Sequence, residues 1–127
     1  MNSLSHPPLS QAIRPNLGAY ASEQEALEAV VERLVVVLDP QAIWLFGSRA
    51  RGDHRPDSDF DLLVVAKEKG SFNSNDYLKC YRATTDLGVD CEVVPCSQED
   101  YRDALTAHTS FVSQIVCHGR HLFEALS

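Results

Sequence analysis

The stretch from Gly47 to Leu62 reads GSRARGDHRPDSDFDL and carries the most specific pattern in the chain. It follows the apolar run 42–46 (AIWLF), which is short and rich in β-forming residues and predicts a buried strand that ends in a tight turn. The run 59–65 (DFDLLVV) alternates polar and apolar residues before it becomes wholly apolar. We therefore expect a second strand there, with its first half facing a cleft.

Two features of this stretch suit a phosphate ligand. Gly47 lets the backbone approach a ligand closely, since it has no Cβ, and Ser48 offers a hydroxyl group and an N–H to phosphate oxygens. Arg49 and Arg51, with Arg55 further along, would place positive side chains beside a triphosphate. The alternative for Arg49 and Arg51 is a solvated helix face.

Asp59 and Asp61 are separated by one residue, so on a strand both carboxylates point to the same face. At an effective dielectric constant near 20 their repulsion is on the order of 2 to 3 kcal/mol, and a bound divalent cation would reverse this cost. Oxygen ligands select Mg²⁺, with Mn²⁺ as an alternative, rather than zinc. The pair therefore indicates a metal site, the alternative being a solvated turn beside a strand.

A third carboxylate would complete a two-metal site and help to deprotonate an attacking hydroxyl. The run 89–95 (VDCEVVP) predicts a third strand and contains Asp90 and Glu92. Because they are two residues apart, both lie on one face of that strand. From the residues alone, either could be the third acid.

Helical patterns surround these strands. Ser22 and Glu25 have the spacing of a capping box, and an apolar period follows until Asp39-Pro40. The expected helices are 22–38, 76–87, 97–107 and 111–118, and the tail 121–127 is a short edge strand or helix. We expect Trp44 in the core, and the apolar stripe 111–116 in the core or at a partner interface. The alternation of helices and strands predicts an α/β (α+β) fold.

The 127 residues, with 44% hydrophobic and 23% charged residues, are enough for one folded domain. We expect a flexible N-terminal leader at 1–20, rich in proline and serine, and the domain at 21–127. The formal net charge of −7 argues against a protein that coats nucleic acid. No segment has the length and character of a signal peptide or a membrane span, and the four cysteines form no CxxC pair, so free thiols and a cytoplasmic location are expected.

Gly47-Ser48, ten intervening residues and Asp59-x-Asp61 resemble the signature of the DNA polymerase β-like nucleotidyltransferase superfamily. The length resembles that of its minimal nucleotidyltransferase (MNT) branch, often paired with HEPN-domain proteins. The resemblance covers about residues 22 to 123, including the closing segment 117–123 (CHGRHLF). It implies the nucleotidyltransferase fold, a small mixed sheet flanked by helices.

The resemblance also implies roles for individual residues. Asp59 and Asp61 would bind two Mg²⁺ ions, and Gly47 and Ser48 would hold the nucleotide phosphates. Counting back from the helix cap at residue 97 places Glu92 at the position of the third acid, where many relatives have Asp. Asp90 remains the alternative third ligand.

The activity implied is transfer of a nucleoside monophosphate to an acceptor hydroxyl, with AMP from ATP favoured over other nucleoside triphosphates. An antitoxin of this type would adenylylate a HEPN toxin, often at a tyrosine. Larger relatives hold the acceptor in a helical domain that this sequence lacks, so a partner chain would bind or be the acceptor, within a homo- or hetero-oligomer. The competing interpretation is a non-catalytic nucleotide-binding or toxin-binding module of the same fold.

Overall fold

One four-stranded mixed sheet, in the order β3-β2-β1-β4, forms the centre of the protein. The computed structural model describes residues 14–126. The strands are β1 (Ala42–Phe46), β2 (Phe60–Val65), β3 (Cys91–Cys96) and β4 (Arg120–Glu124). β1 pairs antiparallel with β2 and β4, whereas β2 pairs parallel with β3. The mixed sheet flanked by helices, expected from the sequence, is confirmed.

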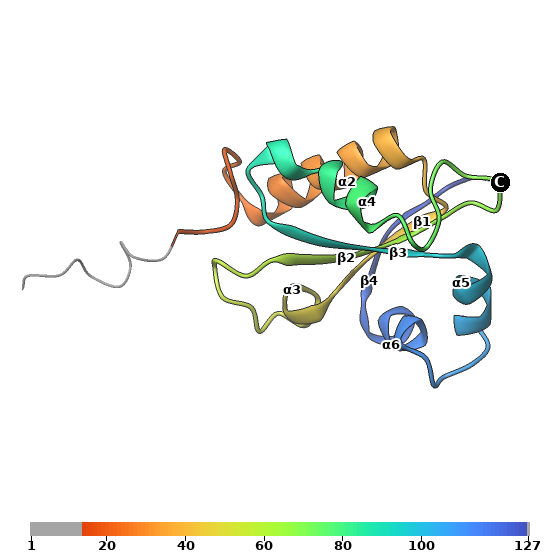
Figure 1. Cartoon of the computed structure of the whole chain (residues 1–127). Helices are drawn as coiled ribbons and strands as arrows, with labels where there is room; N and C mark the ends of the chain where they lie inside the picture. The colour runs from red at the N-terminus through yellow and green to blue at the C-terminus, as the bar shows by residue number, and fades with distance from the viewer. Residues whose placement is uncertain (1–13, 127) are drawn as a thin grey trace, which may run out of the picture.

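Helices cover both faces of the sheet. They are α2 (Glu23–Leu38), α3 (Gly47–Arg51), α4 (Tyr77–Arg82), the 3₁₀ helix η2 (Thr85–Leu87), α5 (Gln98–Ala104) and α6 (Phe111–His118). Figure 1 shows α2 and α4 above the sheet and α3, α5 and α6 below it. The Ser22 hydroxyl accepts a hydrogen bond from the Glu25 N–H, as the predicted cap requires.

Successive strand residues alternate between these two faces. Ile43, Leu45 and Leu62 are fully buried on the side of α2 and α4. Trp44 and Leu63 pack on the other side, among residues of α5 and α6. By the same alternation the first polar position of β2 falls on the face of α5 and α6, which is the face where the site is built.

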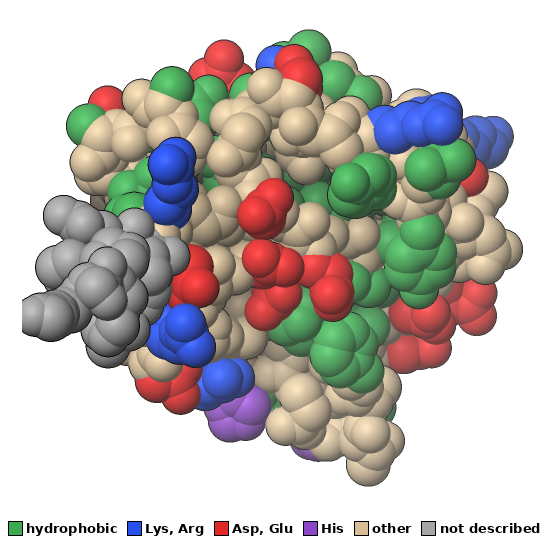
Figure 2. Space-filling model, turned by 60° about the vertical axis from the view of Figure 1, so that its left-hand side comes forward, with side chains coloured by type: hydrophobic (Ala, Val, Ile, Leu, Met, Phe, Trp, Pro, Cys, Tyr) green, Lys and Arg blue, Asp and Glu red, His purple; other side chains and the backbone are tan. Residues whose placement is uncertain are grey.

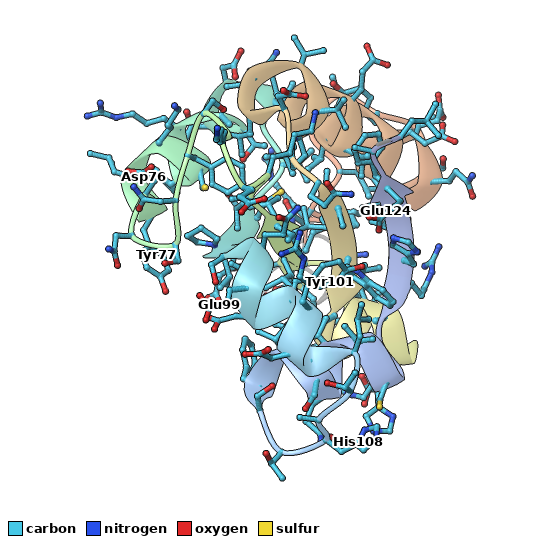
Figure 3. The ribbon with its side chains drawn as sticks, turned by 90° about the vertical axis from the view of Figure 1, so that its right-hand side faces the viewer. Asp76, Tyr77, Glu99, Tyr101, His108 and Glu124 are labelled. Atoms are coloured by element: carbon cyan, nitrogen blue, oxygen red, sulfur yellow. The ribbon has the colours of Figure 1, made fainter. Side chains whose placement is uncertain are left out.

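Trp44 is a core residue, as expected. Its indole N–H donates to the Tyr101 hydroxyl at 3.1 Å, and that hydroxyl donates to Glu124 at 3.2 Å. Figure 3 shows Tyr101 on α5 reaching toward the strand that carries Glu124. Trp44 also stacks on the His121 ring, with centroids 4.5 Å apart. These contacts join α5, β1 and β4.

One expected helix is divided in the structure, and the C-terminal tail, for which the sequence allowed a strand or a helix, is a strand. The helix expected at 76–87 is divided into α4 and η2, because the chain turns at residues 83–84 before Gly88 ends the segment in a left-handed conformation. The C-terminal tail is the edge strand β4, not a helix. Its pairing with β1 supplies the hydrogen bonds that an isolated short strand would lack.

Residues 1–13 of the expected leader lie outside the described residues. The next part packs on the domain: Asn16 is buried, and Leu17 and Tyr20 lie against the main core. The packed region thus begins ahead of the expected boundary at residue 21.

The four cysteines are free, as expected. Burial raises the pKa of Cys80 to about 11 and that of Cys96 to about 12, so both thiols stay protonated near neutral pH. Among the helices of residues 14–126, none combines the length and the apolar character needed to cross a membrane.

Candidate active site

The turn after β1 brings the backbone of Gly47 against a carboxylate of β2. Gly47 has a φ of +73°, in the left-handed region that favours glycine. A Cβ at this position would lie 2.1 Å from Oδ2 of Asp61, which is closer than any real contact. Glycine is therefore required here for two reasons: the backbone conformation and the space taken by Asp61.

Strand register brings Glu92 beside Asp61. Asp61 lies directly across from Phe46 of β1 on one side and from Glu92 of β3 on the other. Neighbouring side chains at one register position share a face of the sheet, about 5 Å apart. Asp59 is exposed just before β2 begins. Figure 2 shows acidic side chains gathered in the middle of one face of the molecule.

The electrostatics of this cluster centre on Asp61. Burial raises the pKa of Asp61 above its ordinary value, and the charges of Glu92 and Asp59 raise it further. Arg51 acts in the opposite direction and lowers it. The half-buried carboxylate therefore lies in a negative field that a cation would neutralise.

Asp90 takes a different place from Glu92. Its carbonyl oxygen accepts a hydrogen bond from the Phe60 N–H at 3.1 Å, one step ahead of the β2–β3 ladder. With Asp59 and Tyr81, Asp90 lines a pocket of about 300 Å³. The pKa of Cys91 is raised to about 12, chiefly by burial, and the charge of Asp90 contributes to this increase. The charge of Glu92, by contrast, raises the pKa of Asp61. Of the two candidate third acids, Glu92 is the neighbour of Asp61.

The donor set fits a hard divalent cation. Asp61 of β2, Glu92 of β3 and Asp59 just before β2 supply carboxylate oxygens, and Gly47 leaves room for the Asp61 carboxylate. Within residues 14–126, no three His, Cys, Asp or Glu side chains are already close enough to form a complete metal-binding group. Like charges repel unless a cation lies between them, so closer approach of these carboxylates depends on what binds there.

Arg49 is not placed as the sequence suggested. Its side chain is 2% exposed, so it is neither on a solvated face nor open to a phosphate. It donates to the carbonyl oxygens of Ser58 and Pro56, both at 3.0 Å, and to the Glu23 carboxylate at 2.9 Å. The guanidinium also lies over the Phe60 ring, 4.2 Å from its centroid. The phosphate contact expected for Arg49 is therefore wrong, and Arg49 instead holds the loop that precedes Asp59.

This placement predicts a difference between two arginines of the same short helix. Arg49→Met should lower the free energy of unfolding by about 2–4 kcal/mol, because it removes the hydrogen bonds that the buried guanidinium donates to two carbonyl oxygens and to the Glu23 carboxylate. Arg51→Met should change it by less than about 0.5 kcal/mol, since Arg51 is 61% exposed. Urea denaturation measures both, and equal losses would contradict the assignment.

Arg51 and Ser48 remain available at the site. Arg51 pairs with the exposed Asp53 at 3.2 Å, a surface contact that a ligand can displace at little cost. Ser48 is half-buried in the first turn of α3, next to Gly47. Arg55 pairs with Asp57 on the surface.

A family model described as polymerase beta, nucleotidyltransferase matches residues 28–126, which is most of the chain. The chain belongs to the polymerase β nucleotidyltransferase family. The match spans β1, α3, β2 and β3, the elements that carry Gly47, Asp61 and Glu92. The MNT-type nucleotidyltransferase expected from the sequence is confirmed.

One curated relative and two solved structures are similar to this nucleotidyltransferase, the structures in fold alone. The probable protein adenylyltransferase MntA of Haemophilus influenzae is 32% identical over 80 residues, 61% of this chain and 70% of that protein. A Sulfolobus solfataricus protein assigned as a nucleotidyltransferase has the same fold, with a TM-score of 0.53, 20% identity and 77% of each chain covered. A toxin–antitoxin structure with AMP-PNP matches with a TM-score of 0.51 and 21% identity, over 82% of this chain and 75% of the other.

The sequence did not point to Asn16 as part of the site of this nucleotidyltransferase. Its side chain donates to the carbonyl oxygens of Ser58 at 3.0 Å and Asp90 at 2.8 Å, and accepts from the Asp90 N–H at 2.6 Å. It thereby ties the residue before Asp59 to the start of β3. Asn16 follows a segment rich in proline and serine, and no local signal marks a long-range role there.

Proposed function

We propose that this nucleotidyltransferase transfers AMP from ATP to a hydroxyl group of a partner protein. The reaction would depend on two Mg²⁺ ions, with Mn²⁺ as a substitute. We further propose that the partner is a HEPN-domain toxin and that the chain acts as its antitoxin, in a hetero-oligomer.

One observation carries the proposal: Asp61 reaches the backbone of Gly47 on one side and neighbours Glu92 on the other. Carboxylates of the kind that Mg²⁺ prefers thus lie directly beside a glycine turn, which supports a metal-bound triphosphate at this position. The name of the Haemophilus relative supports a protein as the acceptor, and the toxin–antitoxin structure with AMP-PNP supports the pairing and an adenine nucleotide.

In the proposed mechanism, Asp59, Asp61 and Glu92 would hold the ions, with Asp90 as the alternative to Glu92. When bound, Mg²⁺ would neutralise the triphosphate and the leaving pyrophosphate. Backbone N–H groups at Gly47 and Ser48 would hold phosphate oxygens.

The transfer itself is an in-line displacement at the α-phosphorus. The acceptor oxygen forms a bond to the α-phosphorus as the bond from that phosphorus to the α–β bridging oxygen breaks. Pyrophosphate leaves with the electron pair. The hydroxyl proton passes to the carboxylate of Glu92, which acts as general base.

A pair of Asp→Asn variants tests this function. Asp59→Asn should reduce label transfer from [α-³²P]ATP to the partner protein by at least 10- to 100-fold, the range seen when even an outer metal partner is lost. Asp57→Asn is the matched control, since Asp57 is in the same loop and its carboxylate pairs with Arg55 on the surface. We expect Asp57→Asn to transfer as the unchanged protein does.

Undiminished transfer by Asp59→Asn would refute the catalytic role of the cluster. A wild-type protein that transfers no label, together with an Asp59→Asn variant that still neutralises the partner in cells, would instead establish the non-catalytic binding module. The substrate in both arms is the protein encoded by the adjacent reading frame.

A further inference from the structure

A pocket of about 290 Å³ opens beside Gly47, between the turn into α3 and the helix α6. Phe46, Gly47 and Arg51 line one side, and Phe111 and Gln114 of α6 line the other. Ligand pockets typically range from about 300 to 1,000 Å³, so this one suits a group of the size of a nucleoside rather than a whole nucleoside triphosphate.

The pocket is continuous with the carboxylate cluster. Phe46 is the cross-strand partner of Asp61, so the two side chains share a face of the sheet. Gly47 belongs to the pocket wall and also touches the Asp61 carboxylate. If the triphosphate group of a nucleoside triphosphate lies at Gly47 and the carboxylates, its nucleoside would therefore extend into this pocket. Figure 2 shows hydrophobic side chains directly beside the acidic cluster.

The apolar wall presents an aromatic ring that the fold does not bury. Phe111 is 58% exposed, although it stands at the start of a helix whose Ile115 is in the core. Its ring meets the Phe46 ring edge to face, with centroids 5.5 Å apart and planes at 89°. This contact holds Phe111 at the pocket wall, where an exposed aromatic face is a stacking surface for a base.

Gln114 adds a polar group of defined direction. Its Nε2 donates to the carbonyl oxygen of His108 at 3.2 Å, so its Oε1 is the amide atom left to accept from a ligand. The amino group at C6 of adenine or at C4 of cytosine can donate to this oxygen. Guanine and uracil present a carbonyl oxygen at the corresponding position, and two acceptors would then face each other.

We propose that this pocket binds the nucleoside of the substrate, with the base stacked on Phe111 and its amino group selected by Gln114. The proposal rests on the proposed function, because it takes the triphosphate to lie at Gly47 and the carboxylates. It adds a base preference: ATP and CTP are bound more tightly than GTP and UTP.

Calorimetric titration with the magnesium complexes of ATP and GTP tests the pocket without any transfer reaction. Phe111→Ala should weaken ATP binding by about 5- to 150-fold, the effect of losing one base–aromatic stack, and Phe111→Tyr should restore it. Tyr77→Ala is the matched control, since Tyr77 is also 58% exposed but lies on α4, apart from the loop of His108 (Figure 3). We expect the control to bind within about twofold of the wild type.

Base selection has its own variant. Gln114→Leu should bring the dissociation constants of ATP and GTP close to each other, because the acceptor that distinguishes them is removed. An unchanged ratio would overturn the role of Gln114, and unchanged ATP binding by Phe111→Ala would overturn the pocket.

Failure of the pocket is distinguishable from failure of the proposed function. If Phe111→Ala binds ATP normally while label transfer still depends on Asp59, the pocket is wrong and the function stands. If wild-type protein transfers no label but binds ATP in a manner dependent on Phe111, the pocket stands and the transferase function is wrong. Failure of the wild type to bind either nucleotide at millimolar concentration would overturn the pocket.

Discussion

Replacing Gly47 by alanine should lower the kcat/KM for adenylyl transfer by about 100-fold. The added methyl group would lie 2.1 Å from Oδ2 of Asp61, so the carboxylate must move. Displacement of a reacting group by about 1 Å is enough for a loss of this size. The variant should still fold, at a cost of about 1–2 kcal/mol for a side chain in the left-handed region.

Gly52→Ala provides a close control for this prediction. Gly52 ends the same helix with a φ of +85°, but a Cβ there would meet nothing within 4 Å. Both variants lose stability because alanine is strained in the left-handed conformation, whereas only Gly47→Ala displaces the Asp61 carboxylate. Comparing their transfer rates and thermal midpoints separates backbone strain from damage to the site. Equal rates would contradict the importance of the Gly47–Asp61 contact.

Asp61→Asn should have opposite effects on activity and stability. We expect transfer to fall by about 10²- to 10³-fold, as when one group that stabilises transition-state charge is lost. In EDTA the Tm should rise by a few degrees, because a neutral amide avoids the cost of burying the charge and the repulsion from Glu92 and Asp59. The charge of Asp61 would thus lower the stability of the metal-free protein while it is needed for transfer.

Scanning calorimetry with and without Mg²⁺ checks this pair of effects. Mg²⁺ should stabilise the wild type by mass action and leave Asp61→Asn nearly unchanged. Asp57→Asn, which alters an exposed carboxylate, should respond to Mg²⁺ as the wild type does. An Asp61→Asn protein that is less stable than the wild type in EDTA would show that Asp61 supports the fold instead of straining it.

Local pattern was sufficient for much of the fold. The apolar runs of β1 and β2 and the capped period of α2 were predicted within one residue of their observed bounds. Such elements are short-range: a cap, a turn glycine and the alternation of side chains are all encoded by neighbours in sequence. The break between α4 and η2 was not predicted, because the pattern of residues 76–87 is compatible with one continuous helix.

The tertiary structure buries one of the two arginines that follow Ser48 and leaves the other exposed. In sequence, Arg49 and Arg51 are equivalent cations beside a phosphate motif. In the structure, the Arg49 guanidinium lies over the Phe60 ring and donates to the carbonyl oxygens of Pro56 and Ser58, so its buried charge has hydrogen-bond partners. Arg51 points outward and stays at the site. Nothing within a few residues of either arginine distinguishes them.

What the sequence by itself determined is the family and the chemistry, since Gly47-Ser48 and Asp59-x-Asp61 have a spacing specific enough to name both. The tertiary structure decided which acid of β3 stands beside Asp61 and which helix lines the pocket beside Gly47. The parallel register of β2 and β3 places Glu92 beside Asp61. Packing of α6 on the sheet brings Phe111 to the wall of the pocket. Register between strands distant in sequence depends on burial over the whole sheet, so local sequence cannot encode it.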